Sequence, residues 1–224
     1  MANENRLGSA SFRSLITELN SLNSNLDLNL INDRSGTSCK YYEYQEFNTL
    51  ISTSKFNFSA FHLNISSLAK HFEEFNALLG LLNINFSVIG ISETRFVKDS
   101  PPIFDFNIEG YSAVHTPTES SAGGALLYVS NHLSYFPRTD LADIIYKPKE
   151  LESVFVELSF SNKANFIVGC IYKHPGLSVN VFKTDFLSPL LQFVARENIS
   201  LLFCWGTLIS IFLNIASMMK SLDS

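Results

Sequence analysis

The sequence is short of charge and of cysteine. Charged residues make up 17% of the 224 residues, the net charge is −5, and the three cysteines (Cys39, Cys170 and Cys204) stand far apart. The acidic balance disfavours a protein that binds nucleic acid through bulk positive charge, while a local basic groove stays compatible with it. The cysteines form no CxxC pair, and the first residues show no apolar run typical of a secretory signal. We therefore expect reduced thiols and an intracellular location, nuclear or cytoplasmic.

Hydrophobic residues are plentiful, at 46% of the chain. This content is enough for a substantial core and excludes wholesale disorder. Residues 1–40 differ from the rest because they are polar, with Leu15, Leu19, Leu22 and Leu26 spaced along one helical stripe. We expect a polar, partly disordered or short-helical segment over 1–40 and a folded α/β domain over 41–204.

From Phe56 onward, apolar runs with strand and helix periodicity follow one another. Several strands arrive in succession between two helical stretches, which a simple βαβ repeat does not explain. A sandwich of two sheets flanked by helices fits this order better. The expected strands cover residues 56–64, 86–92, 111–115, 123–130, 153–160, 165–172 and 199–204, and the expected helices cover 66–82 and 181–197.

Three of these strands end on polar side chains. Asn64 ends the strand in "HLNISSL", Glu93 follows the strand in "IGISETRF", and Tyr172 ends the strand in "GCIYKHPG". Strand ends that gather at one edge of a sheet are where α/β folds place reacting groups. Each residue also has a plainer interpretation: Asn64 as a helix N-cap, Glu93 as a solvated acid and Tyr172 as an aromatic at the core edge.

The order of these pieces resembles the endonuclease domain of non-LTR retrotransposons, a branch of the endonuclease/exonuclease/phosphatase superfamily. The resemblance runs from about Tyr41 to Cys204 and rests on "HLN…SL", "IGISET", "GGALLYVS", "IVGCIYKHP" and "LLFC" in this order. It implies an α/β (α+β) fold, here a partial four-layer αββα sandwich. It also implies Mg²⁺-dependent cleavage of a DNA phosphodiester, with DNA as the partner, no small-molecule cofactor, and a linked reverse transcriptase.

The resemblance assigns roles to the three strand-end residues. Glu93 matches the family's Mg²⁺ ligand, and a carboxylate suits this hard cation. Asn64 matches an amide that orients the phosphate or a metal-bound water, and counts as a second candidate metal contact. Tyr172 matches a tyrosine that hydrogen-bonds the phosphate. Glu152 and Glu157 are expected on strand faces, with Glu152 at most an outer contact.

Two family motifs are absent from the sequence. After the "LLFC" strand the family carries Gly-Asp-Phe-Asn, and later Ser-Asp-His, whose histidine is the general base. Here "WGTLISIFLN" follows instead. One codon choice for residues 205–214 encodes Gly-Asp-Phe-Asn when read in another frame. We therefore expect a truncated domain, frameshifted near residue 205, with an out-of-frame hydrophobic tail over 205–224 and little or no catalytic activity.

Two alternatives stay open. The run from Ile199 to Met219 carries no charge and is long enough to span a bilayer, although Thr207, Ser210 and Asn214 dilute its hydrophobicity. It would then anchor a non-catalytic interaction protein that reuses the nuclease scaffold. An active phosphatase or exonuclease of the same superfamily would need its histidine and aspartate from other positions.

Overall fold

The structure is a computed structural model that describes residues 42–53, 58–100, 102, 104–160, 165–190, 193 and 200–205. The expectations for residues 1–40 and for the tail after Trp205 lie outside these residues. In the described part, no helix is long and apolar enough to cross a membrane.

The first sheet has four strands in the order β1-β2-β4-β3. They are β1 (Ala60–Asn64), β2 (Val88–Ser92), β3 (Tyr111–Thr116) and β4 (Ala125–Ser130). β1 and β2 run parallel, while β4 is antiparallel to both β2 and β3. All five residues of β2 are buried, as its continuous apolar pattern predicts for a central strand.

The second sheet also has four strands, in the order β5-β6-β7-β8. They are β5 (Ser134–Pro137), β6 (Leu151–Ser159), β7 (Phe166–Lys173) and β8 (Ser200–Trp205). β8 confirms the strand expected over 199–204 and pairs in parallel with β7, with Cys204 opposite Cys170. The first part of the uncharged run 199–219 is therefore a sheet strand.

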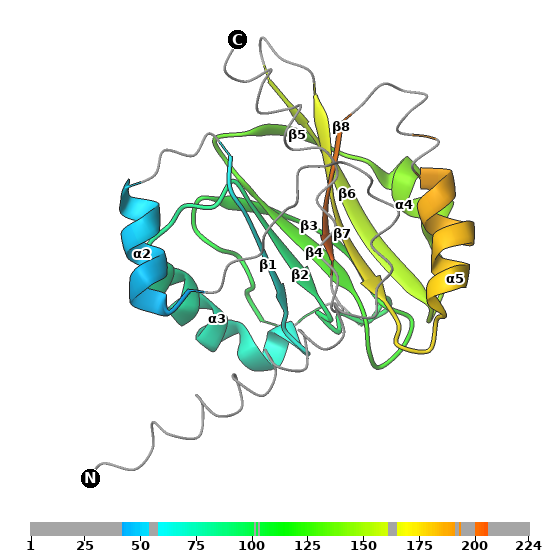
Figure 1. Cartoon of the computed structure of the whole chain (residues 1–224). Helices are drawn as coiled ribbons and strands as arrows, with labels where there is room; N and C mark the ends of the chain where they lie inside the picture. Colours follow the sequence, from blue (N-terminus) through cyan, green and yellow to red (C-terminus); the bar gives the residue numbers. More distant parts are fainter. Residues whose placement is uncertain are drawn as a thin grey trace. The chain divides into compact units, whose positions relative to one another are not determined.

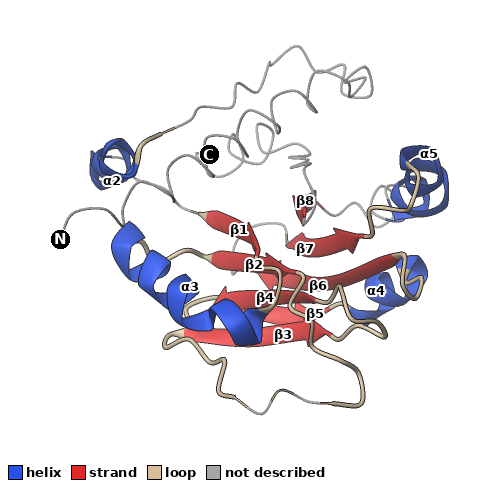
Figure 2. Cartoon of the chain, turned by 90° about the horizontal axis from the view of Figure 1, so that it is seen from below, coloured by secondary structure: helices blue, strands red, loops and turns tan. Residues whose placement is uncertain are grey.

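Helices flank the sheets on both sides (Figures 1 and 2). α3 (Leu68–Leu82) covers the outer face of the first sheet, and α2 (Tyr44–Thr53) is joined to it where Asn48 Nδ2 donates to Leu81 O at 3.1 Å. α4 (Thr139–Ile145) and α5 (Val179–Val181), which continues as a π-helix over Phe182–Leu187, cover the outer face of the second sheet.

The period-two pattern of the strands distributes their side chains between the layers. On β6, Val154, Val156 and Leu158 face the first sheet, whereas Phe155 points outward under α4 and the π-helix. Residues of β2 and β4 complete the core between the sheets from the other side. The resulting order, helix, sheet, sheet and helix, confirms the expected αββα layering.

The structure corrects two details of what the sequence predicts. The sequence places Ser66 or Ser67 to cap the helix over 66–82; Ser67 occupies the N-cap position of α3, at φ 146°, but its side chain makes no capping hydrogen bond. β5, α2 and α4 were not expected from the sequence. They are short, and β5 and α4 are stabilised by contacts with β6 that are distant in sequence.

Candidate functional site

The three strand-end residues singled out from the sequence meet at one edge of the sandwich. Asn64 lies beside Ser92 at the ends of the parallel strands β1 and β2, and Glu93 follows directly. In the second sheet, Tyr172 near the end of β7 pairs with Glu152 near the start of β6. Val154 and Cys170 face the space between the sheets. Glu152 and Tyr172 stand two residues away from them on the same strands, so their side chains face the same way.

Asn64 holds the carboxylate of Glu93. Its Nδ2 donates to Glu93 Oε1 at 3.0 Å, and its Oδ1 accepts from the backbone N–H of Ser66 at 3.2 Å. Asn64 therefore forms a turn with Ser66 and is not the N-cap of α3. The first amide of that helix, at Leu68, donates instead to Thr94 O at 3.1 Å. The helix start and the loop that carries Glu93 are thus joined directly.

The loop after β2 has an unusual backbone. Glu93 and Arg95 have φ angles of 56° and 57°, and Ser66 on the neighbouring loop has φ 56°. The left-handed region costs a non-glycine residue about 1–2 kcal/mol, so the surrounding contacts must stabilise this conformation. One such contact joins the two loops, because Arg95 Nη2 lies 3.3 Å from Ser66 Oγ. The strained turn directs the Glu93 side chain toward Asn64.

Tyr172 completes the cluster from the second sheet. The residue is only 2% exposed, and its hydroxyl is hydrogen-bonded to Glu93. Burial raises the pKa of Tyr172 to about 12, and the charge of Glu93, its hydrogen bond and the charge of Glu152 act in the same direction. Tyr172 therefore stays protonated at neutral pH and donates its hydroxyl proton to the Glu93 carboxylate.

Glu152 is a buried carboxylate on β6, the strand position that the sequence predicts for it. It is 0% exposed, and it accepts hydrogen bonds from the Thr118 hydroxyl at 2.6 Å and from the backbone N–H of Gly124. A β-carbon at Gly123 would collide with the Glu152 carboxylate, and one at Gly124 would collide with the Thr94 hydroxyl. The pair of glycines in "AGGALL" was the sequence signal for this close approach.

His174 lies beside the cluster as well, although the sequence gives it no assigned role and favours an exposed position for it. Its ring packs edge-on against Tyr172 at 4.9 Å between centroids. Its Nε2 is buried and makes no hydrogen bond within the described part of the chain. The imidazole therefore places a nitrogen without a hydrogen-bond partner among the described residues next to Tyr172.

The donor set at this edge suits Mg²⁺ better than a transition metal. Among the described residues, no group of three or more His, Cys, Asp or Glu side chains is placed to hold a metal. Mg²⁺ does not need such a cage, because it keeps several waters and commonly uses one or two carboxylates together with phosphate oxygens. The partly exposed carboxylate of Glu93 and the Asn64 amide oxygen match this requirement.

No protein-family model matches the sequence, and no curated protein matches it. The fold is similar to several solved structures. The AP endonuclease LMAP from Leishmania major matches with a TM-score of 0.43 and 14% identity, over 73% of this chain and 60% of that chain. The Xenopus laevis APE2 catalytic domain matches with a TM-score of 0.41 and 12% identity, over 66% and 57%.

A third match is the 3′ phosphatase NExo from Neisseria bound to product DNA hairpin, with a TM-score of 0.40 and 15% identity over 66% and 57% of the two chains. The chain thus spans 57% to 60% of the length of these three structures. At these identities and TM-scores, the matches establish no family for this chain.

Proposed function

We propose that this chain binds a DNA phosphodiester together with Mg²⁺ at the cluster of Asn64, Glu93 and Tyr172. The observation that carries the proposal is the hydrogen-bonded contact of all three residues, brought from strands of two sheets to one edge. Such an arrangement costs backbone strain at Glu93, and strained non-glycine residues concentrate at functional sites.

Each residue has a distinct task in this proposal. Glu93 holds the cation through its carboxylate, and Asn64 fixes the direction of that carboxylate through its amide. Tyr172 presents a protonated hydroxyl, whose single proton turns from Glu93 to a phosphate oxygen when the strand binds. When bound, Mg²⁺ supplies positive charge that neutralises the phosphate.

We also propose that the chain cleaves DNA poorly or not at all. Directly after the "LLFC" strand, "WGTLISIFLN" stands where the retrotransposon endonucleases carry Gly-Asp-Phe-Asn, and a phosphodiesterase site that loses polar groups of its catalytic machinery loses a large factor in rate. The chain is then a nuclease-type domain that binds its substrate better than it hydrolyses it. The ring of His174 contacts Tyr172 of the cluster, and His174 lies outside the family's motifs.

A DNA-binding measurement tests the site. A fluorescently labelled single-stranded oligonucleotide is titrated with the protein in Mg²⁺ and in EDTA. We expect Mg²⁺ to strengthen binding, and Glu93→Gln to abolish the strengthening. Glu109→Gln, at an exposed glutamate in the turn before β3, serves as the matched control and retains it. Equal affinity of the unchanged protein in Mg²⁺ and EDTA would contradict the proposed site.

A plasmid-nicking assay tests the proposed lack of cleavage. Supercoiled plasmid incubated with the protein and Mg²⁺ is expected to stay supercoiled. Robust nicking that Glu93→Gln abolishes would overturn the proposed inactivity while supporting the metal site.

The origin of the chain is a separate proposal. We propose that it derives from the endonuclease domain of a mobile element, is located inside the cell, in the nucleus or cytoplasm, and was frameshifted near residue 205. The motif order supports the origin, and the widely spaced cysteines support the location. The coding DNA is the test: the alternative frame from residue 205 must encode Gly-Asp-Phe-Asn, and any other sequence there rejects the frameshift.

A further inference from the structure

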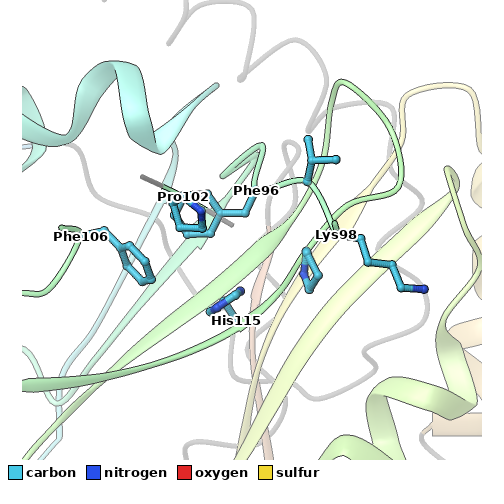
Figure 3. A pocket seen from close by; sticks show the side chains of 7 residues that line it. Phe96, Lys98, Pro102, Phe106 and His115 are labelled. Carbon is cyan, nitrogen blue, oxygen red and sulfur yellow. The ribbon is translucent and has the colours of Figure 1, made fainter. Parts of the chain in front are cut away.

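A pocket of about 330 Å³ opens beside the loop that carries Glu93 (Figure 3). Flat side chains dominate its lining: the rings of Phe96, Phe106 and His115, together with Pro102 and Pro117. Lys98 also borders the pocket, and Figure 3 shows its side chain reaching away from the aromatic rings. The pocket is therefore mostly apolar, with one histidine inside and one cation at its border.

The aromatic wall is held in a defined geometry. The His115 ring lies 5.6 Å from Phe96 and 5.9 Å from Phe106 between centroids, at interplanar angles of 86° and 89°. Phe96 and Phe106 are themselves 4.9 Å apart. Such edge-to-face contacts restrict ring orientation. Burial also lowers the pKa of His115 and so favours its neutral ring, in which one nitrogen donates and the other accepts a hydrogen bond.

Backbone hydrogen bonds join the pocket to the candidate site. The amide of Thr118 donates to Phe96 O at 2.7 Å, and the amide of Lys98 donates to Thr118 O at 3.0 Å. The hydroxyl of the same Thr118 donates to Glu152 at 2.6 Å. Hydrogen bonds through Thr118 thus connect the pocket wall with the buried carboxylate of Glu152, which pairs with Tyr172 across the sheet.

The separation along the chain limits the distance between pocket and site. Phe96 follows Glu93 by three residues, so their Cα atoms lie within about 11 Å of each other. A nucleic-acid strand advances about 3.4 Å per nucleotide in a duplex and further when extended. A strand with a phosphate at Glu93 therefore reaches the pocket within about three nucleotides.

We propose that this pocket receives an unpaired nucleobase of the same DNA strand whose phosphate is held at Glu93. The flat face of a nucleobase can pack against the apolar walls, and its polar edge can hydrogen-bond to the neutral imidazole of His115. Aromatic platforms next to cations are how proteins hold single strands without pairing. Lys98 forms an ion pair with Glu119 at 3.1 Å, and its side chain is 59% exposed. Its ammonium group can therefore also contact a phosphate that flanks the base. The inference rests on the proposed function, since it assumes that a phosphate of the same strand is bound at Glu93.

A comparison of two labelled strands tests the pocket in EDTA, so that no metal contributes. One is a single-stranded oligonucleotide with all its bases, and the other has the same length and phosphates but abasic sites throughout. We expect the base-bearing strand to bind at least about tenfold more tightly. His115→Ala should remove most of that preference, and His115→Phe should retain it because the ring stays.

His132→Ala is the matched control, since His132 is an exposed histidine in the turn after β4, at the opposite end of the first sheet. It should leave the preference unchanged, and circular dichroism should show that all variants fold. Equal binding of the two strands, or a base preference that survives His115→Ala, overturns the inference. The Mg²⁺ dependence of binding and its loss in Glu93→Gln report on the proposed function separately, so either idea can fail alone.

Discussion

Asn64 donates from its side-chain amide to the Glu93 carboxylate at 3.0 Å, across 29 positions of sequence. The contact forms because β1 and β2 are parallel neighbours, with Asn64 in register with Ser92. It links the proposed metal ligand, Glu93, to the residue that orients its carboxylate.

Removing this amide should weaken metal binding without removing the metal ligand itself. We expect Asn64→Ala to lower Mg²⁺ affinity about tenfold, the lower end of what loss of a ligand-orienting hydrogen bond costs. Isothermal titration calorimetry measures the change. Asn76→Ala, on the exposed side of α3, is the control and should bind Mg²⁺ like the unchanged protein. An unaltered affinity in Asn64→Ala would show that the amide does not position Glu93.

The two glycines before β4 should not tolerate a side chain. Gly123 and Gly124 have φ angles of 110° and 85°, and a β-carbon on either would collide with Glu152 or Thr94. We expect Gly123→Ala and Gly124→Ala each to lower the free energy of unfolding by about 2–4 kcal/mol, from backbone strain and overpacking together.

Gly110→Ala separates the two causes of this loss. Gly110 also has a positive φ, at 81°, but a β-carbon there meets no atom within 4 Å. Strain alone should cost this variant about 1–2 kcal/mol. Urea denaturation of the three variants measures the difference, and equal losses at all three positions would argue against the clashes with Glu152 and Thr94.

The ionisation of Tyr172 should report on both carboxylates. The charge and hydrogen bond of Glu93 raise the pKa of Tyr172, and Glu152 adds a smaller effect in the same direction. Glu93→Gln should therefore lower the pKa of Tyr172 more than Glu152→Gln does. Ultraviolet titration of phenolate formation follows the change, with Tyr172→Phe identifying the signal. A larger shift in Glu152→Gln would place the hydroxyl nearer to Glu152 than to Glu93.

His62 on β1 should make the fold sensitive to acid. Burial lowers the pKa of His62 to about 4, and its Nε2 makes no hydrogen bond among the described residues. Below pH 6.5 the unfolded chain takes up this proton and the folded chain does not, so stability falls as the pH drops toward 4. The loss amounts to about 3 kcal/mol, at about 1.4 kcal/mol per pKa unit.

His62→Leu should remove this part of the acid sensitivity, because leucine fills the half-buried position without a titrating group. The free energy of unfolding is measured by urea titration at pH 7 and at pH 4.5. The difference between the two pH values should shrink in His62→Leu and stay unchanged in His132→Leu, where the histidine is exposed. An equal difference in both variants would contradict the assignment to His62.

Much of the architecture could be predicted from local pattern. The alternation in "SVFVELSF" predicts which residues of β6 face the first sheet, and Val154, Val156 and Leu158 do so. The spacing of Phe182, Phe186 and Leu190 predicts one buried helical face, and all three pack into the same cluster. These predictions succeed because strand and helix periodicity is a property of neighbouring residues.

The candidate site was predicted only in part. Asn64, Glu93 and Tyr172 could be named from their positions at strand ends, and the structure brings them into contact. The burial of Glu152 could not be predicted, because its sequence neighbourhood is that of an ordinary strand. Its burial becomes visible only when Thr118 and Gly124 arrive from another part of the chain to donate hydrogen bonds.

Local sequence pattern is enough to predict seven of the eight described strands, the buried helical faces and the polar residues that end the strands, since each depends on residues close along the chain. The tertiary structure decided which of those polar residues meet, and that Tyr172 serves as a donor to Glu93. It also decided that the aromatic residues after Glu93 line a pocket. Contacts between side chains from different sheets depend on strand order and register, and these are set by the packing of the whole domain.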